Sequence, residues 1–333
     1  MNTSKKILVI GGAGYVGSAL VPKLLMRGHY VRVLDTFWFG KKFLEYCPNL
    51  RGMLDLRKGD MRDTGFLEEA ASDIDVIIHL ACVSNDPSFD LNPQLGRSVN
   101  FDAFLGLIEV LKKVRPKYFI FASTSSVYGV KEEKNVTENL SLEPLTDYSK
   151  YKCLCEFALK GFISPKVIPW VIIRPATVCG WSPRLRLDLT VNILTANAYF
   201  KKKIKVFGGI QKRPNIHVDD MTDLYVDLAE KCETRISGQV FNAGWENFTI
   251  LEIAEMVRDV VGSDVAIEIV PTDDIRSYHI SSAKIKRWLG WQPKKSIKDA
   301  INDLIAAFKA GKVTDPDDDI YYNIKVMKKL GLG

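Results

Sequence analysis

A glycine-rich turn close to the amino terminus constrains the fold of this 333-residue chain more than any other feature of its sequence. The apolar run 6–10 leads directly into the segment 11–17, GGAGYVG, and a helical pattern follows from about Tyr15 to Arg27. The glycines at positions 11, 14 and 17 let a diphosphate approach the backbone, and the first turn of the helix directs free N–H groups toward it. The pattern therefore predicts a strand–turn–helix unit that binds a dinucleotide.

An acidic residue at the end of the second predicted strand supports this interpretation. The run 31–35 ends at Asp35. A carboxylate there accepts hydrogen bonds from both ribose hydroxyls, and its charge repels a 2′-phosphate. No lysine or arginine follows until Lys41, so the sequence favours NAD over NADP. Taken separately, the glycines are also typical of a tight turn and Asp35 of a strand-end cap, but their occurrence together favours the dinucleotide site.

Short apolar runs alternate with helical patterns along the first half of the chain. Strand-like runs lie at 31–35, 54–59, 75–81, 118–122 and 167–174, and helical patterns at 15–27, 64–72, 93–114 and 147–162. Continuous Val/Ile/Leu strands separated by helices indicate a parallel sheet covered on both faces, and right-handed crossovers make it doubly wound. We therefore predict an α/β Rossmann fold, a doubly wound parallel sheet, with a smaller C-terminal α/β substrate lobe.

The alternation loosens after Arg174, where helical patterns mix with short apolar runs. We expect residues 1–178 and 214–243 to form the NAD-binding Rossmann domain. Residues 179–213 and 244–333 are expected to form the substrate-binding lobe, which is then partly interleaved with the first domain.

Composition excludes several classes of protein. Hydrophobic residues make up 47% of the chain and charged residues 26%, which is ordinary for a globular protein with a buried core. No apolar run approaches the ~18 residues of a membrane-spanning helix, and the polar amino terminus carries no signal-peptide core. The basic residues are scattered apart from 201–203, so neither nucleic acid nor a membrane is an expected partner.

The cysteines and histidines lack the spacings of metal ligands. The six cysteines lie in apolar or helical contexts, and the four histidines are far apart in the sequence. We expect reduced thiols in a cytoplasmic protein and no metal site.

A second group of residues predicts a reacting centre. Tyr148 and Lys152 are four residues apart in a predicted helix, and so share one face. A tyrosine with a pKa of about 10 becomes a usable base when an ammonium and a positively charged cofactor ring stabilise its phenolate. Thr124 follows the run 118–122, at the edge where an open sheet presents residues to its ligand. Alone, such a Tyr/Lys pair is common on exposed helices, and the Thr124 hydroxyl is equally suited to cap a loop.

Several further motifs occur in the order typical of one enzyme superfamily. They are GDMRD at 59–63, HLAC at 79–82, STSSVYG at 123–129, YSKYK at 148–152, RPATVCG at 174–180 and RPNIHVDD at 213–220. With the glycine-rich turn and Asp35, these motifs give the chain its resemblance to the extended short-chain dehydrogenases/reductases, in the NAD-dependent sugar epimerase/dehydratase branch that includes UDP-galactose 4-epimerase. The resemblance covers most of the chain.

The resemblance implies roles for individual residues. Thr124, Tyr148 and Lys152 match the catalytic set. The positions implied to contact NAD are Gly11, Gly14, Tyr15, Val16, Gly17, Asp35, Asp60, Met61, Leu80, Ala81, Asn100, Tyr148 and Lys152. Those implied to contact a nucleotide-diphosphate sugar are Thr124, Ser125, Thr177, Arg184, Arg213 and Arg276. Guanidinium groups suit phosphate oxygens, so the resemblance implies that Arg213 and Arg276 bind the substrate diphosphate; the alternative for each alone is a surface charge. Arg184 and Arg186 are both candidates for substrate contact, and the alternative for them is a solvated loop.

Departures from the family pattern narrow the implied activity. The 4,6-dehydratases carry an Asp-Glu pair directly after the catalytic threonine, and decarboxylating relatives usually carry a Glu there. This chain has Ser125 and Ser126 instead, so both activities are disfavoured. Thr177 replaces a frequent asparagine, which implies that the substrate is handled differently.

The resemblance therefore implies an NAD-dependent nucleotide-sugar 4-epimerase that oxidises the sugar at C4 and returns the hydride, with a place in polysaccharide biosynthesis. The alternatives are a 4-dehydrogenase or 4-ketoreductase, less favourably a 4,6-dehydratase, and a non-catalytic NAD-binding sensor. The nucleotide and the sugar stay open. In related proteins the helices equivalent to 93–114 and 147–162 form a four-helix dimer interface, so we expect a homodimer. The alternative is that these faces only pack against the sheet.

Overall fold

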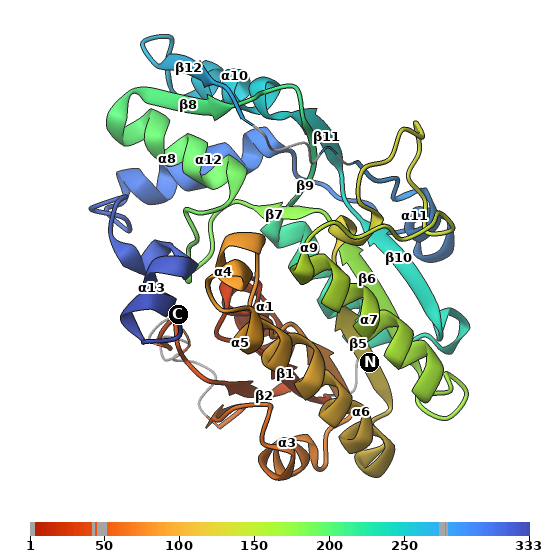
Figure 1. Cartoon of the computed structure of the whole chain (residues 1–333). Coiled ribbons are helices and arrows are strands. Elements are labelled where there is room, and N and C mark those ends of the chain that lie inside the picture. The colour runs from red at the N-terminus through yellow and green to blue at the C-terminus, as the bar shows by residue number, and fades with distance from the viewer. Residues whose placement is uncertain (1–3, 42–43, 45–51, 273–276, 278) are drawn as a thin grey trace.

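The central sheet of the computed structural model is parallel and seven-stranded, and its strand order reverses once (Figure 1). The order is β10-β6-β5-β4-β1-β2-β3. The strands are β1 (Lys6–Ile10), β2 (Tyr30–Asp35), β3 (Leu54–Lys58), β4 (Val76–His79), β5 (Tyr118–Ala122), β6 (Trp170–Pro175) and β10 (Gln239–Ala243). The structure describes residues 4–41, 44, 52–272, 277 and 279–333. The reversal between β1 and β4 is the point where ligands bind in such sheets, and the predicted fold class is confirmed.

Alternate residues of each strand supply the two faces of the core. Ile7 and Val9 of β1 pack toward α1 (Tyr15–Met26) and α9 (Val218–Lys231). Leu8 and Ile10 pack toward the other face, which is covered by α3 (Thr64–Ala71), α6 (Ala103–Val114) and α7 (Asp147–Phe162). Because both faces are covered, the strands read as continuous apolar runs rather than as alternating ones.

The predicted helical stretch over 93–114 is helical throughout, but a π-helical turn divides it. The structure has α5 (Pro93–Arg97), then a π-helical turn (Ser98–Asp102), and then α6. The turn carries Asn100, whose Oδ1 accepts from the Val83 N–H at 2.7 Å and whose Nδ2 donates to the Val83 carbonyl at 3.0 Å. Wider turns of this kind are common at functional sites, and this one aims an amide at the loop after β4.

The second lobe contains two small sheets and three packed helices. The sheets have the orders β11-β9-β7 and β12-β8. Their strands are β7 (Thr177–Cys179), β8 (Lys203–Phe207), β9 (Lys212–His217), β11 (Glu246–Thr249) and β12 (Ala266–Val270). The helices α8 (Thr190–Lys201), α10 (Ile250–Val261) and α12 (Ile297–Lys309) share one apolar core. Shorter helices in this part of the chain are α11 (Ala283–Leu289) and α13 (Asn323–Lys329); the short α4 (Asp86–Leu91) follows β4 of the central sheet. The chain leaves the central sheet for this lobe after β6, and it returns to the central sheet and its covering helices with α9 and β10. The domain boundaries given above stay a proposal.

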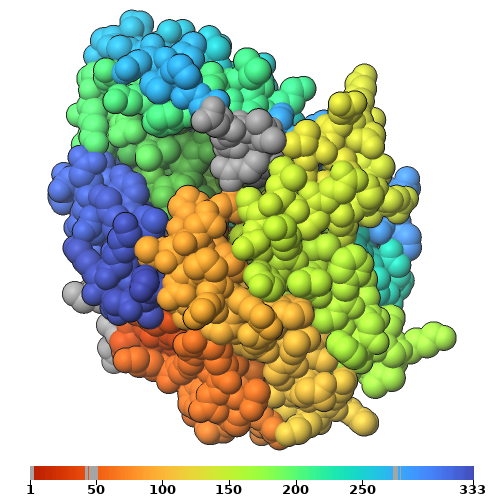
Figure 2. Space-filling view, viewed as in Figure 1, coloured from red at the N-terminus to blue at the C-terminus, as the bar shows by residue number. Residues whose placement is uncertain are grey.

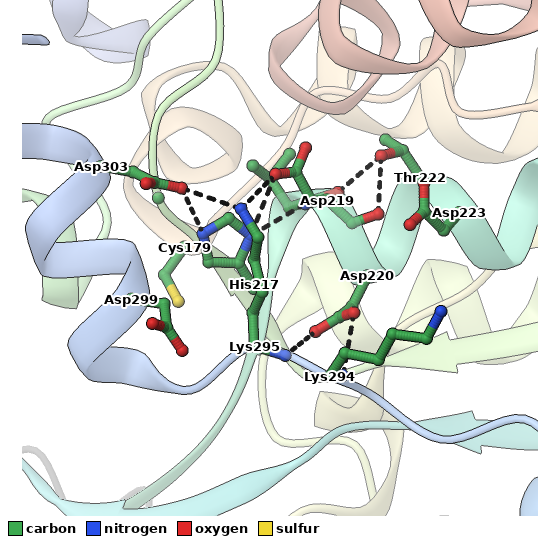
Figure 3. Close-up of polar contacts among 12 residues, drawn as sticks. Cys179, His217, Asp219, Asp220, Thr222, Asp223, Lys294, Lys295, Asp299 and Asp303 are labelled. Atoms are coloured by element: carbon green, nitrogen blue, oxygen red, sulfur yellow. Dashed lines mark hydrogen bonds and ion pairs between the residues drawn. The ribbon is translucent and has the colours of Figure 1, made fainter.

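A charged network joins the two lobes where β9 runs into α9 (Figure 3). The Asp220 carboxylate accepts from the backbone N–H groups of Lys294 at 3.0 Å and Lys295 at 2.8 Å. The Lys295 ammonium contacts Asp219 at 2.7 Å and Asp303 at 3.1 Å.

The same network contains the three residues that approach each other as metal ligands do. His217, Asp219 and Asp303 offer ligand atoms within 4.8 Å of one another. Burial and the charge of Lys295 hold the pKa of His217 below its usual range. Since an ammonium already bridges the two carboxylates, we interpret the group as an ion-pair network.

No helix in the described part of the chain is long and apolar enough to cross a membrane.

We predict that Asp220→Asn lowers the free energy of unfolding by roughly 1–3 kcal/mol, because an amide NH₂ replaces one acceptor and leaves a partly buried backbone N–H of Lys294 or Lys295 unpaired. The control is Asp223→Asn, which removes only an exposed ion pair with Lys23 and is expected to cost about 0–1 kcal/mol. Urea unfolding measures both. Equal losses in the two variants contradict the role given to Asp220.

Candidate active site

A cavity of about 370 Å³ lies at the carboxyl ends of the central strands. Its wall includes the glycine-rich turn, Asp35, Thr124, Tyr148 and Lys152. The sequence-predicted cofactor end and reacting centre therefore belong to one continuous site.

The glycine-rich turn is packed too closely for larger residues. Gly11 has φ +84°, and a Cβ there meets the Ala81 backbone nitrogen at 2.6 Å. A Cβ on Gly17 meets the Gly12 carbonyl oxygen at 2.5 Å. Gly14 precedes α1 and has no side chain to cap the helix. The first-turn N–H groups and the positive end of the helix dipole thus face the cavity, and they suit a diphosphate.

Asp35 is fixed beside this turn by the backbone. Its carboxylate accepts from the N–H of Ala13 at 2.9 Å and from the N–H of Phe37 at 2.8 Å. Burial raises its pKa, and these hydrogen bonds act in the opposite direction. A carboxylate has about four acceptor sites, so it can still receive hydrogen bonds from ribose hydroxyls.

The other predicted cofactor residues fall into two groups. Asp60, Met61, Leu80 and Ala81 line the same cavity. Asn100 does not line it and instead holds the loop at Val83 through the two hydrogen bonds given above. The structure therefore gives Asn100 a positioning role, one layer behind the cavity wall.

The three predicted catalytic residues come together from two elements. Tyr148 is half-buried in the first turn of α7, and its phenol is close enough to the Thr124 side chain, just after β5, for the two groups to interact. Lys152 is one turn further along, and its Nζ donates to the Ala122 carbonyl at 2.8 Å. A capping box between Thr146 and Ser149 fixes the start of the helix. A hydroxyl, a phenol and an ammonium thus meet at the carboxyl edge of the sheet.

Burial raises the pKa of Tyr148 well above its ordinary value, and the charges of Cys82 and Asp86 add to this effect. Arg186 and the hydrogen bond with Thr124 act in the opposite direction. The sequence predicted a lowered pKa through Lys152 and a bound cofactor ring. In the protein alone the larger effect is the opposite, so the phenol is protonated until additional positive charge arrives.

The residues predicted to contact substrate do not all gather together. Ser125 and Thr177 line the main cavity. Arg213 lines a neighbouring cavity of about 90 Å³ with Asp86. Arg276 lies outside the described residues.

The structure places Arg184 toward the cofactor end of the cavity. Its guanidinium lies 4.1 Å from the centroid of the Phe39 ring and close enough to Asp35 for their charges to interact.

A family model for the NAD dependent epimerase/dehydratase family matches residues 7–244. The chain belongs to this family. It is therefore an NAD-dependent enzyme of the extended short-chain dehydrogenase/reductase type, and NAD is its cofactor, as the sequence predicted.

Relatives within the family differ in activity. UDP-glucose 4-epimerase of Lactobacillus helveticus is 28% identical over 322 residues, which cover 90% of this chain and 95% of the relative. UDP-glucuronic acid decarboxylase 1 of Arabidopsis thaliana is 30% identical over 315 residues, covering 91% of this chain and 70% of the relative. Among solved structures, UDP-glucuronic acid 4-epimerase from Bacillus cereus, in complex with UDP-glucuronic acid and NAD, is 28% identical with a TM-score of 0.81. That match covers 92% of this chain and 99% of the solved one.

Sequence reasoning missed a buried ion pair behind the reacting centre of this epimerase/dehydratase family member. Glu156 accepts from the Arg174 guanidinium at 2.8 and 2.6 Å and from the Ser123 hydroxyl at 2.6 Å. Burial works to raise the pKa of Glu156, but Arg174 holds it below its usual range. Arg174 also donates to the Tyr128 hydroxyl at 2.7 Å. An arginine at the end of a buried Val/Ile strand was the available signal, because such a charge needs a partner.

We predict that Glu156→Gln lowers the free energy of unfolding by about 3–5 kcal/mol, because it leaves the Arg174 charge buried without its counterion. Lys160→Gln is the matched control. Lys160 contacts the same carboxylate at 3.2 Å but is partly exposed, so its loss is expected to cost about 0–1 kcal/mol. Denaturant titration of both variants measures the difference, and a small loss for Glu156→Gln contradicts the prediction.

Proposed function

We propose that this family member is a nucleotide-sugar 4-epimerase. The single observation that carries the proposal is that Tyr148, Thr124 and Lys152 line one cavity, with the phenol beside the threonine hydroxyl and serines following Thr124. The Tyr, Thr and Lys set suits proton transfer at a sugar hydroxyl. The hydroxyls of Ser125 and Ser126 do not supply the acid and base needed to remove water or to handle a carboxylate.

NAD, when bound, would supply a reversible hydride acceptor for the sugar. Tyr148 takes the proton of the sugar 4-hydroxyl as the C4–H bond gives up its hydride, so the sugar becomes a 4-ketone. Thr124 holds the reacting oxygen, and Lys152 supports the phenolate and the adjoining ribose. Rotation of the ketone in the pocket, followed by hydride return and protonation by Tyr148, gives the 4-epimer.

The proposed substrate is a nucleotide-diphosphate sugar bound between the reacting centre and Arg213. Relatives named above act on UDP-glucose and UDP-glucuronic acid, which makes UDP-sugars the first compounds to test. The contacts of Ser125, Thr177 and Arg276 with the substrate are proposals, and so are the contacts of individual residues with the cofactor. The cytoplasm is the proposed location.

Incubation of the purified enzyme with UDP-, GDP-, dTDP- and CDP-sugars tests the activity. Absorbance follows NADH, and NMR follows the configuration at C4. We expect a 4-epimer without net accumulation of NADH. Sustained NADH with a 4-keto product identifies a 4-dehydrogenase instead, and loss of carbon dioxide identifies a decarboxylase; either result overturns the proposal.

Tyr148→Phe is expected to lower kcat roughly 10²- to 10⁴-fold, the usual contribution of a positioned base, with NAD still bound. Tyr151→Phe is the matched control, because Tyr151 lies on the same helix and stacks on Phe89 at 5.6 Å.

Since the pKa of Tyr148 is raised and the base acts deprotonated, kcat/KM of the wild type should rise as pH rises above neutrality. A flat profile contradicts the assignment.

We also propose a homodimer that pairs α6 and α7 with those of a second copy. Leu107, Ile108 and Leu111 are buried in the core, but Leu154 and Phe157 of α7 are 42% and 57% exposed. Two large apolar side chains on one exposed helix face fit an interface between copies. Light scattering is expected to give the mass of a dimer, and Phe157→Glu to shift it toward the monomer. A monomeric wild type rules the proposal out.

A further inference from the structure

The segment from Gly180 to Asp188, which joins β7 to α8, folds back over the glycine-rich turn. The Tyr15 hydroxyl donates to the Gly180 carbonyl at 2.7 Å, and the Ser182 hydroxyl donates to the Tyr15 carbonyl at 2.6 Å. Ser18 lies 2.7 Å from the Ser182 hydroxyl and accepts from the backbone N–H of Arg184 at 3.0 Å. This segment of the second lobe is therefore tied to the first turns of α1, where a diphosphate binds.

The segment carries Arg184 and Arg186, which are only 5% and 7% exposed and line the main cavity. Arg184 donates through Nη2 to the Asn323 side-chain oxygen at 2.6 Å, and its Nε is buried without a hydrogen-bond partner. Arg186 donates to Asp188 at 2.8 Å and to Ser84 at 3.1 Å, and its Nη2 is buried without one. Buried donors of this kind are costly unless an acceptor completes them.

The charge around these guanidinium groups favours an anion as that acceptor. Asp188 pairs directly with Arg186. Arg184 has no such ion pair among the described residues, and burial together with the charge of Arg186 lowers its pKa to about 9. A diphosphate relieves this repulsion, and its oxygens accept from guanidinium forks with good geometry.

The neighbours of each arginine place the pair along the length of the dinucleotide site. Arg184 faces Asp35 and Phe39, at the end where the adenosine ribose binds. The charge of Arg186 acts on Tyr15 and Tyr148, toward the reacting end. The stretch between them lies over the glycine-rich turn, which is the position of the cofactor diphosphate.

The carboxyl-terminal segment fixes both arginines in place. Asn323, at the start of α13, accepts from Arg184, donates to Ser84 at 3.0 Å, and donates its backbone N–H to Asp188 at 3.1 Å. In Figures 1 and 2 this segment, in blue, lies against the orange segment that contains α4. Met327 of α13 joins an apolar cluster with Val83, Phe39 and Leu91.

We propose that Arg184 and Arg186 bind the diphosphate of NAD, that Asn323 positions them, and that the three residues form a clasp that retains the cofactor through turnover. Arg184 then belongs to the cofactor site and not to the substrate site that the sequence predicted for it. The inference rests on NAD being the cofactor and does not depend on which sugar reacts.

Binding of ADP-ribose and of adenosine, measured by calorimetry on NAD-free enzyme, tests the clasp without any sugar. Arg184→Gln and Arg186→Gln are each expected to weaken ADP-ribose roughly 10- to 100-fold, the range for a lost hydrogen bond to a charged group, and to change adenosine binding little. The control is Arg97→Gln, which removes an exposed arginine paired with Asp102 and should leave both affinities unchanged.

Three outcomes overturn the proposal. Equal weakening of adenosine and ADP-ribose makes the arginines part of the pocket shape only. Unchanged ADP-ribose binding with weaker binding of a UDP-sugar returns Arg184 to the substrate site. The third outcome is an affinity of the folded wild type for ADP-ribose that is no better than its affinity for adenosine. If the glutamine variants do not fold, Arg184→Lys and Arg186→Lys replace them in the same measurements.

Retention itself is measured on the purified enzyme as the fraction of sites that hold NAD and as the rate at which bound NAD exchanges with labelled NAD. We expect the wild type to retain NAD through purification and Asn323→Ala to exchange it at least tenfold faster. Fast exchange in the wild type contradicts a retaining clasp even if the arginines contact the diphosphate.

Discussion

The close packing of the glycine-rich turn is the constraint on which the rest of the site depends. Gly17 sits against the backbone of Gly12, and Gly11 sits against Ala81 at the end of β4. Any side chain at these positions pushes α1 away from the point where the strand order reverses. Because the turn is tight, the amino-terminal end of α1 points into the cavity, and Asp35 can be held by the N–H of Ala13. The cofactor end is therefore built by backbone geometry more than by specific side chains.

The reacting end is built differently, from charge buried behind the sheet. Glu156 on α7 binds Arg174 on β6 and the Ser123 hydroxyl directly beside Thr124. These contacts connect α7, which carries Tyr148, to β6 and to the residue before Thr124. A charged pair in the core contributes little net stability, but its fixed geometry accounts for a phenol and a hydroxyl that meet in the absence of substrate.

The sequence predicts local parts of this site and misses those that depend on the second lobe. The glycine spacing, Asp35, and the four-residue separation of Tyr148 and Lys152 are local patterns, so the fold class and the cofactor follow directly from them. The placement of Arg184 is not local, because it depends on how 180–188 folds onto Ser18 and on a contact with Asn323 more than a hundred residues later. The π-helical turn at Asn100 was also missed, since residues 98–102 include no helix-breaking residue and the hydrogen bonds of Asn100 with Val83 are not local.

Arg186 links the two ends of the site. Its guanidinium lines the cavity over the glycine-rich turn, and its charge opposes the burial that keeps Tyr148 protonated. An anion bound to Arg186 would weaken the effect of its charge on the pKa of Tyr148. The positive nicotinamide ring would then be the main charge that favours the phenolate. Hydride transfer to that ring would remove its charge, and the Tyr148 phenol would then hold its proton more firmly. In the proposed 4-epimerase reaction, a protonated Tyr148 held beside the cofactor would be the group that returns the proton to the oxygen of the 4-ketone.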